Sequence, residues 1–264
     1  MMKKTLFTIL VFMLTICSYA QQKTIMRYNY AGKIVSDKTQ PQKIEESVFV
    51  LDIDSTQSSR FLELALLERK QSVATAKDQN ELMQVLHTYR PKTDFTVFYF
   101  NGIATTNTAI HTTVYTYQDS ISDLVWKMEP NREKWNTYTV QRATTFYEGR
   151  QWNVLFTLDI PLRDGPYKFK NLPGFVVKAW DDEHHYEFEF INSEKVTIDN
   201  WDLVNPKEIV TQITPQQYEK ALKVYQNKTY KDLLIEMNPE NAKTIPDEYA
   251  EKIGLRSNLI FKVQ

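Results

Sequence analysis

Apolar and polar residues alternate in several segments of this 264-residue chain, as expected for β-strands with one buried face. The alternation is clearest over residues 152–160, where polar positions separate Trp152, Val154 and Phe156. The same pattern predicts strands at residues 26–34, 48–53, 95–100, 110–117, 124–128, 136–147, 175–180 and 186–190. These segments are rich in Tyr, Phe, Trp and Thr, which suit pleated and partly exposed surfaces.

Helical periodicity is found in two regions. Apolar residues recur at helical spacing within residues 58–88, but a polar stretch at 71–79 interrupts them, so two helices or one helix and a loop both fit. Nearer the C-terminus, Thr214 and Gln217 form a capping box with Pro215 at the first helical position, which predicts a helix over residues 215–225. Residues 258–263 fit an edge strand.

These elements favour a single β-rich domain. Strands that follow one another without alternating helices indicate an antiparallel sheet, and no repeat or change of composition divides residues 21–264. A sheet with so many aromatic residues must curl or be covered on one face. We therefore predict a mainly β (α+β) fold: a curved antiparallel sheet, as an open bowl or incomplete barrel, with one or two helices packed across it.

Residues 1–20 have the pattern of a secretory signal peptide. Lys3 and Lys4 precede an apolar run at residues 5–17, and small residues before the junction of Ala20 and Gln21 predict cleavage there. The run is shorter than the roughly 20 residues that span a membrane, and no later segment resembles a span. We expect no transmembrane segment in the mature chain and an exported protein that is periplasmic, associated with the outer membrane, or secreted.

Lipidation at Cys17 is the alternative to this cleavage, because a cysteine at such a position can become the first residue of a lipoprotein. The preceding residue, Ile16, is larger than the small residue that lipoprotein processing prefers. This mismatch favours cleavage after Ala20, which leaves the mature chain without cysteine.

The composition excludes several classes of protein. The chain is 42% hydrophobic and 25% charged with a net charge of −1, which argues against a nucleic-acid partner held by phosphate contacts. Its six glycines exclude a collagen, and its single cysteine excludes both an intramolecular disulfide and a cysteine-based zinc cluster.

Residues 135–190 carry a set of short motifs that resembles a known family. The naming motif corresponds to Leu172-Pro173-Gly174 and its neighbours. The other matching positions are Gly149, Arg150, Trp152, Ile160, Pro161, Gly165 and Pro166. The chain is thereby similar to the GLPGLI family, secreted proteins of the Bacteroidetes of largely unknown function. The resemblance implies an envelope location and an association with outer-membrane transport systems, but no established activity.

The motif itself has a physical interpretation. Pro173-Gly174 fits the central positions of a type II turn, because Pro fixes φ near −65° and Gly accepts a positive φ. Gly165-Pro166 predicts a second rigid bend between the strand ending at residue 160 and the strand starting at residue 175. These residues indicate a corner of the sheet, or alternatively a surface for a ligand or partner.

The densest polar cluster contains Asp181, Asp182, Glu183, His184 and His185, which are metal-ligand types. It is placed as a hairpin loop between two strands, so it is either a solvated turn or a metal site. Adjacent residues on a strand point to opposite faces, so both histidines can bind one ion only if the loop bends.

A second polar group comprises Asp159, Arg163 and Asp164, with Arg150 nearby in the predicted structure. It forms either a polar site or a rim of ion pairs at the strand ends. The sequence lacks the motifs of zinc proteases, α/β-hydrolases, dinucleotide-binding folds and P-loops, and we expect no cofactor.

The absence of catalytic motifs favours a binding or carrier module over an enzyme. Its ligand would be an apolar molecule, a peptide or an outer-membrane protein partner. The alternative is a metal-binding protein or hydrolase that uses residues 181–185 or 159–164.

Overall fold

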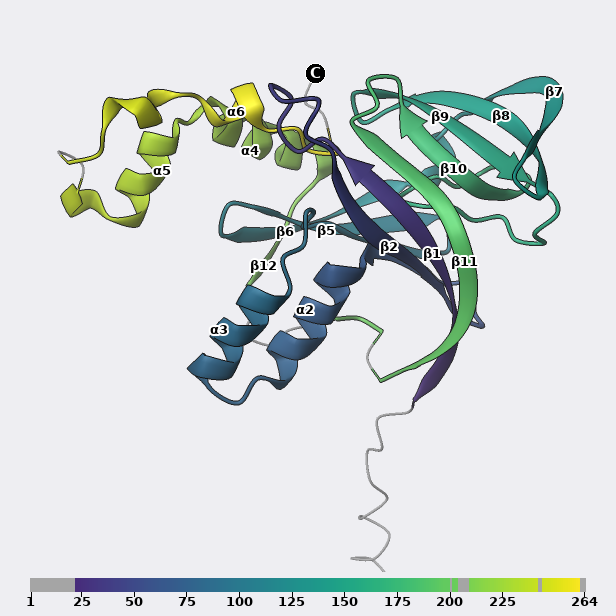
Figure 1. The fold of residues 1–264 in the computed structure, drawn as a ribbon, viewed down its shortest axis with the longest axis horizontal. Helices are drawn as coiled ribbons and strands as arrows, with labels where there is room; N and C mark the ends of the chain where they lie inside the picture. The colour runs from purple at the N-terminus through teal and green to yellow at the C-terminus, as the bar shows by residue number, and fades with distance from the viewer. Residues whose placement is uncertain (1–21, 200, 204–208, 242–243, 262–264) are drawn as a thin grey trace, which may run out of the picture.

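A computed structural model describes residues 22–199, 201–203, 209–241 and 244–261. Within these residues, twelve strands form one sheet in the order β12-β6-β5-β4-β3-β2-β1-β11-β10-β9-β8-β7 (Figure 1). The strands are β1 Lys23–Ile34, β2 Glu45–Ile53, β3 Ser59–Glu63, β4 Thr96–Phe100, β5 Ile103–Ile110, β6 Thr113–Ser120, β7 Lys127–Trp135, β8 Tyr138–Tyr147, β9 Arg150–Thr157, β10 Phe175–Asp181, β11 Tyr186–Ile198 and β12 Val210–Gln212. The predicted cleavage site, Ala20 and Gln21, and Cys17 lie outside the described residues.

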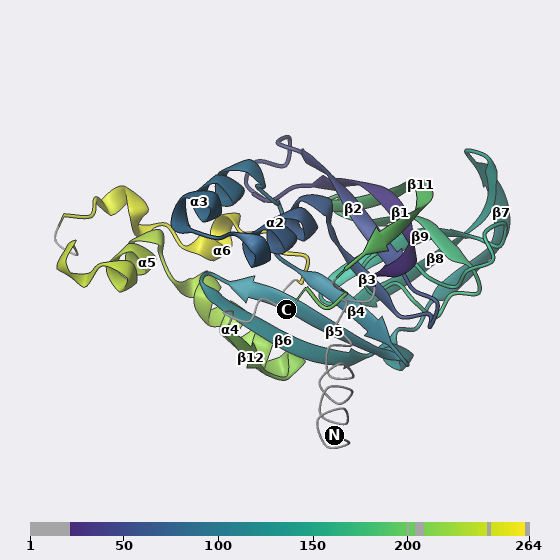
Figure 2. The ribbon, with the colours of Figure 1, turned by 90° about the horizontal axis from the view of Figure 1, so that it is seen from below.

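Five α-helices accompany this sheet in the described part of the chain. They are α2 Leu64–Thr75, α3 Gln79–Thr88, α4 Pro215–Asn227, α5 Tyr230–Met237 and α6 Ile253–Arg256. Helix α5 lies at the end of the molecule opposite to β7 (Figure 2). Of the helices described, none has both the length and the apolar character needed to cross a membrane. Short 3₁₀ segments occur at Ile121–Asp123, Pro239–Asn241 and Asp247–Ala250.

Neighbouring strands are antiparallel throughout, except that β12 lies parallel to β6. The two end strands, β12 and β7, do not pair with each other, so the sheet is open. The prediction of a mainly β fold with helices is therefore confirmed.

One face of the sheet, called the inner face here, carries the main core. It is dominated by aromatic side chains, as in the contacts of Phe188 with Phe49 and Phe61, whose ring centroids lie 5.0 and 5.3 Å away. Tyr30 is fully buried among them, and its hydroxyl donates to the carbonyl oxygen of Val176 at 2.7 Å. The aromatic composition noted in the sequence thus builds the core itself.

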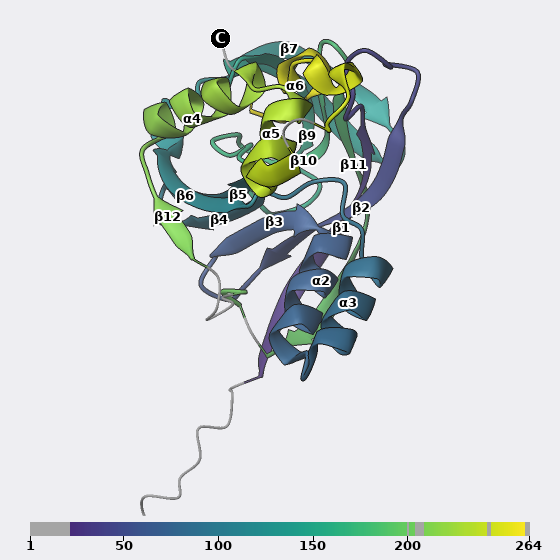
Figure 3. The same ribbon diagram turned by 90° about the vertical axis from the view of Figure 1, so that its left-hand side faces the viewer.

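Helices pack on both faces of the sheet. Val50 and Leu62 point away from the inner face, because side chains alternate along a strand, and they pack with Leu66 and Leu67 of α2. On the inner face, Tyr218 of α4 packs with Tyr117 of β6. Figure 3 shows α4 above and the pair α2–α3 below strands β3 to β6.

Residues 158–174, called the strap here, connect β9 to β10 and cover part of the inner face. Lys168 of the strap pairs with Asp119 on β6 at 2.7 Å, and Lys170 donates to Ser59 on β3 at 2.9 Å. Both strands are far from β9 in the sheet order. The segment that carries most of the sequence motifs therefore crosses the sheet and is more than a corner between two strands.

The glycines of the strap serve close packing. Only Gly102 and Gly149 have positive φ among the described glycines, so the predicted type II turn with Gly174 at positive φ is wrong. A Cβ on Gly174 would collide with the carbonyl oxygen of Thr157, and one on Gly165 would lie 2.7 Å from Cβ of Val176. Gly is required at both positions because backbone or side chains approach too closely for any larger residue.

The helical predictions are largely confirmed. The helix predicted at residues 215–225 is α4, and it has the expected capping box between Thr214 and Gln217. The region 58–88 contains two helices, one of the two arrangements allowed, but it begins with strand β3, which was not predicted. Helices α5 and α6 were also not predicted.

Two strand predictions are wrong. The segment 110–117 is not one strand, since it contains the end of β5, a turn with His111 at a φ of 57°, and most of β6. Of the edge strand predicted at residues 258–263, residues 258–261 are not a strand, and the Arg150 side chain binds the carbonyl oxygens of Leu259 and Ile260. Residues 262 and 263 lie outside the described residues. Of the strand predicted at 124–128, only residues 127 and 128 are in a strand, since β7 begins at Lys127. The remaining predicted strands occur, with shifts at their ends.

Candidate functional site

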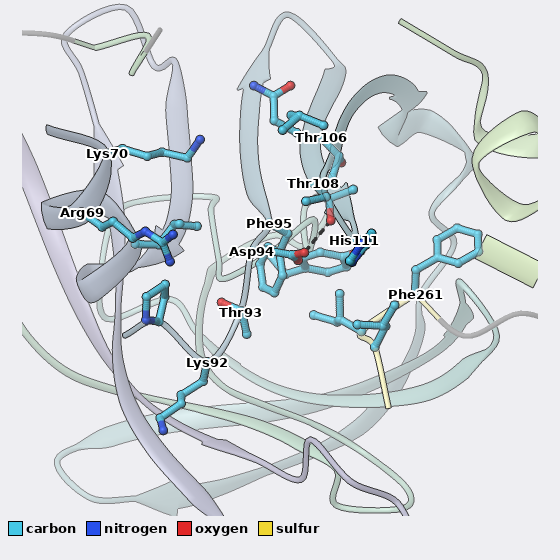
Figure 4. Close-up of a pocket in the computed structure, with 18 of the residues that line it drawn as sticks. Arg69, Lys70, Lys92, Thr93, Asp94, Phe95, Thr106, Thr108, His111 and Phe261 are labelled. Atoms are coloured by element: carbon cyan, nitrogen blue, oxygen red, sulfur yellow. Dashed lines mark hydrogen bonds between the residues drawn. The ribbon is translucent and has the colours of Figure 1, made fainter. Parts of the chain in front are cut away.

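A pocket of about 530 Å³ opens at the end of the sheet between four parts of the molecule (Figure 4). Helices α2 and α3 form one wall, and strand β5 with the turn to β6 forms the facing wall. The loop 91–95 and the C-terminal residues 259–261 complete the lining. A pocket of this volume is in the usual range for small-molecule sites.

Aromatic side chains from the inner face form the floor of the pocket. Tyr117 and Tyr218 stack with ring centroids 4.9 Å apart, and Phe95 meets the edge of Tyr167 at 5.5 Å. Burial raises the pKa of Tyr117, Tyr167 and Tyr218, so these phenols stay neutral. The floor therefore offers an uncharged surface to an apolar or aromatic group.

A buried carboxylate fixes the loop that carries the polar groups of the pocket. Glu63, at the end of β3, is 1% exposed and accepts hydrogen bonds from the backbone N–H groups of Lys92 and Thr93, both at 2.8 Å. The Thr93 hydroxyl donates to the same carboxylate oxygen at 3.0 Å. These bonds set the direction in which the next residue, Asp94, enters the pocket.

Asp94 faces the pocket and its side chain remains accessible there. Thr108 on β5 donates to Asp94 Oδ1 at 3.2 Å. The surrounding walls strip water from the carboxylate, and this desolvation raises the pKa of Asp94, opposed by the Thr108 hydrogen bond and the positive charge of Lys70. Figure 4 shows Arg69 and Lys70 on the α2 side of the pocket and Asp94 with Thr108 toward the other side.

Arg150, a motif residue, positions the C-terminal wall of the pocket. Its guanidinium is buried and donates to the carbonyl oxygens of Leu259 and Ile260 at 2.7 and 3.0 Å, and to Asn258 Oδ1 at 2.8 Å. It also pairs with Asp181 at 2.7 Å. The motif is thus connected to the pocket through the backbone that Arg150 holds.

The other motif residues have structural roles. Gly149 follows Glu148 in a two-residue hairpin between β8 and β9, where both have positive φ, which is the geometry of a type I′ turn. Trp152 is fully buried against Phe169, with ring centroids 4.8 Å apart. Of the rest, Pro166, Gly165, Gly174 and Leu172 are buried, Ile160 packs against the core, and Pro161 and Pro173 are exposed.

A second group of charges lies under the strap. The Lys168 amine is fully buried, 2.5 Å from Glu148 Oε1 and 2.7 Å from Asp119 Oδ2, and 4.7 Å from the ring centroid of Tyr117. Burial lowers the pKa of Lys168, but the attraction of Glu148, Asp119 and the surrounding groups exceeds this and raises it overall. Burial raises the pKa of Glu148. Every charge in this group is paired, which is the pattern of a structural network.

The hairpin predicted between β10 and β11 is present and brings three ligand types together. One ligand atom from each of Asp181, Glu183 and His185 lies within 4.8 Å of the others. Of the sequence candidates, Asp182 instead accepts a hydrogen bond from Asn153 at 2.6 Å, and His184 is exposed with Nδ1 3.7 Å from Glu187. The two adjacent histidines thus do not converge.

Asp181 is already occupied by protein groups. One carboxylate oxygen accepts the backbone N–H groups of His185 and Tyr186, both at 2.8 Å, and the other pairs with Arg150. A guanidinium so close to the carboxylate repels a second cation. The contacts of the hairpin therefore favour the solvated turn over the metal site.

The polar group predicted around residues 159–164 is dispersed. Asp159 accepts a hydrogen bond from the backbone of Thr139 at 2.8 Å, whereas Asp164 pairs with Lys170 and Arg163 is exposed. Arg150 pairs with Asp181 and not with these residues. Of the two alternatives, these contacts do not support a polar site shared with Arg150, and the ion pair of Asp164 with Lys170 fits the other alternative, a rim of ion pairs.

Sequence reasoning missed the pocket because its lining comes from several distant segments. The residues concerned include Arg69, Lys70, Asp94, Thr108 and His111. None of them stands in a recognisable spacing, and His111 lies in the turn between β5 and β6.

No family model matches the chain, and no curated protein matches it. Among solved structures, it is similar to PNGF-II in a C2 crystal form, with a TM-score of 0.51 and 12% identity over 76% of this chain and 33% of that one. A P21 form gives 0.50 and 12% over 79% and 36%. The chain thus spans about a third of PNGF-II, and identities this low show a similar fold alone.

An uncharacterised conserved protein from Thermus thermophilus also matches, with a TM-score of 0.36 and 6% identity over 72% of this chain and 91% of that one.

Proposed function

We propose that the protein is a non-enzymatic binding or carrier module that takes a small apolar group into the pocket between α2, α3, β5 and the C-terminal segment. The observation that carries this proposal is the pocket of about 530 Å³ with its floor of neutral aromatic rings. Burial of apolar surface contributes about 25 cal/mol per Å², so a ligand that covers this floor gains affinity without covalent chemistry.

We propose further that the sheet is curved into an open bowl. The strap supports this, since a single segment contacts β9, β10, β6 and β3, and Figure 1 shows β11 as a long bent strand. A bulge between Asn29 and Tyr30, where the pairing of β1 with β11 shifts, supplies part of such a bend. In this proposal the strap and α4 fill the bowl, and the pocket lies at its mouth.

We propose that this module acts in the cell envelope, as its resemblance to the GLPGLI family implies. We propose that residues 1–20 direct export and that the protein acts in the periplasm, at the outer membrane, or outside the cell. An outer-membrane protein partner remains part of this proposal, as an acceptor or donor of the ligand.

Binding of the neutral fluorescent probe N-phenyl-1-naphthylamine tests the pocket. We expect saturable binding at one site per chain. Leu86→Trp on α3 adds bulk inside the pocket and should abolish most of the fluorescence increase, and Val73→Trp on α2 should act in the same way.

Leu234→Trp on α5 is the matched control, because Leu234 is exposed and lies outside the pocket lining. Circular dichroism checks that each variant is folded. Absence of saturable binding by the folded wild type, or equal binding by all four proteins, would contradict the proposed function.

A further inference from the structure

One cation on the pocket wall has no counter-charge within the described residues. Arg69 on α2 is half-buried, lines the pocket, and makes no hydrogen bond or ion pair with another described residue. The neighbouring cations interact with carboxylates. Lys92 Nζ lies 3.2 Å from Glu45 Oε1, and the positive charge of Lys70 opposes the rise in the pKa of Asp94. The α2 side of the pocket therefore carries an excess of positive charge.

The position of the Arg69 side chain indicates which kind of ligand group the pocket can bind. Figure 4 shows its side chain extending from α2 toward the open space of the pocket, whereas Asp94 is held on the other side by Thr108. A guanidinium presents N–H donors in a planar fork that matches the oxygens of a carboxylate, sulfonate or phosphate. The aromatic floor below it has no such charge.

We infer that the ligand of the pocket is an amphipathic acid, whose apolar body lies on the aromatic floor and whose acid group binds Arg69. This inference rests on the proposed binding function and adds the chemical class of the ligand. Asp94 is a specificity element in this arrangement, because it disfavours an acid group on the β5 side and directs it to α2.

Displacement of bound N-phenyl-1-naphthylamine by three amphiphiles with the same chain tests the inference. The competitors are dodecanoate, dodecanol and dodecylammonium, each below its micelle concentration. We expect dodecanoate to bind about tenfold more tightly than dodecanol, a difference of ~1.4 kcal/mol, and dodecylammonium to bind most weakly.

Arg69→Gln should remove about a tenfold advantage of dodecanoate and leave dodecanol unchanged. Arg132→Gln on β7 is the matched control, because Arg132 is exposed and outside the pocket, and it should behave as wild type. Equal affinity for dodecanoate and dodecanol, tighter binding of dodecylammonium, or an Arg69→Gln variant that keeps the preference overturns the inference. Each of these results leaves the binding function standing, whereas failure of the probe itself to bind refutes the function.

Discussion

The charges under the strap and the charges of the pocket are built from the same residue types but differ in their partners. Lys168 is fully buried between two carboxylates, Glu148 and Asp119. Arg69 lines an accessible pocket and has no partner among the described residues. Removing a buried cation whose partners are all in the protein leaves their charges uncompensated, whereas a cation without such partners is available to a ligand.

The two regions meet at Tyr117 and Tyr167. Tyr167 donates to Glu148 under the strap, and its ring also forms part of the pocket floor. The Lys168 amine lies 4.7 Å from the ring centroid of Tyr117, which lines the pocket as well. The paired charges therefore hold in place the floor on which the ligand is proposed to bind.

The largest expected effect is a difference in stability between two variants, each of which removes one cation from one of the two regions. Lys168→Met leaves two carboxylates facing an aromatic interior, and breaking a buried pair in this way costs about 3–5 kcal/mol. Arg69→Gln breaks no pair and should leave stability nearly unchanged. Urea unfolding of both variants measures the difference. Similar losses in the two variants, or none in Lys168→Met, would show that the two regions do not differ as described.

The sheet could be predicted from the sequence, because alternation reports directly on a face that is half buried. Alternation failed where a turn lacked its usual residues, as at His111, which has a φ of 57° without being Gly, Asn or Asp. It also failed at Phe61 and Leu62, whose spacing fits the helix that follows as well as the strand to which they belong.

The site could not be predicted in the same way, because it depends on which charges remain unpaired. The sequence pattern singles out Asp181 as a candidate metal ligand and does not single out Arg69. In the structure, Asp181 pairs with Arg150 and accepts hydrogen bonds from two backbone N–H groups, whereas Arg69 lines the pocket. Such assignments follow from contacts between residues far apart in the chain, and only the fold determines them.

A smaller effect on stability is expected from the titration of Asp94. Its folded pKa lies above the unfolded value, so the folded state binds the proton more tightly, and ionisation costs stability as pH rises from the unfolded pKa through the folded one. Asp94→Asn removes this cost while keeping an acceptor for Thr108. The melting temperature of the variant relative to wild type should therefore increase with pH over that interval and then level off.

Asp232→Asn provides a control of opposite sign. Hydrogen bonds from the backbone and side chain of Thr229 at the start of α5 lower the pKa of Asp232, so its charge contributes stability above the unfolded pKa that is lost at lower pH. The variant should be less stable than wild type near neutrality, and the two should converge as pH falls. Parallel pH profiles for the two variants would contradict the assignment of Asp94 to a desolvated wall.

The smallest effect is expected at the hairpin, where the comparison is tested most directly. Asp181, Glu183 and His185 are close enough to suggest a metal, yet Arg150 already neutralises Asp181 and lies 3.8 Å from Glu183. Since these carboxylates are paired within the protein, like those under the strap, equimolar zinc should not change the melting temperature of the wild type. His185→Ala should give the same result. A stoichiometric, zinc-dependent rise in melting temperature that this substitution removes would show that pairing with Arg150 does not prevent metal binding. The distinction between paired charges and charges available to a ligand would then be wrong at this hairpin.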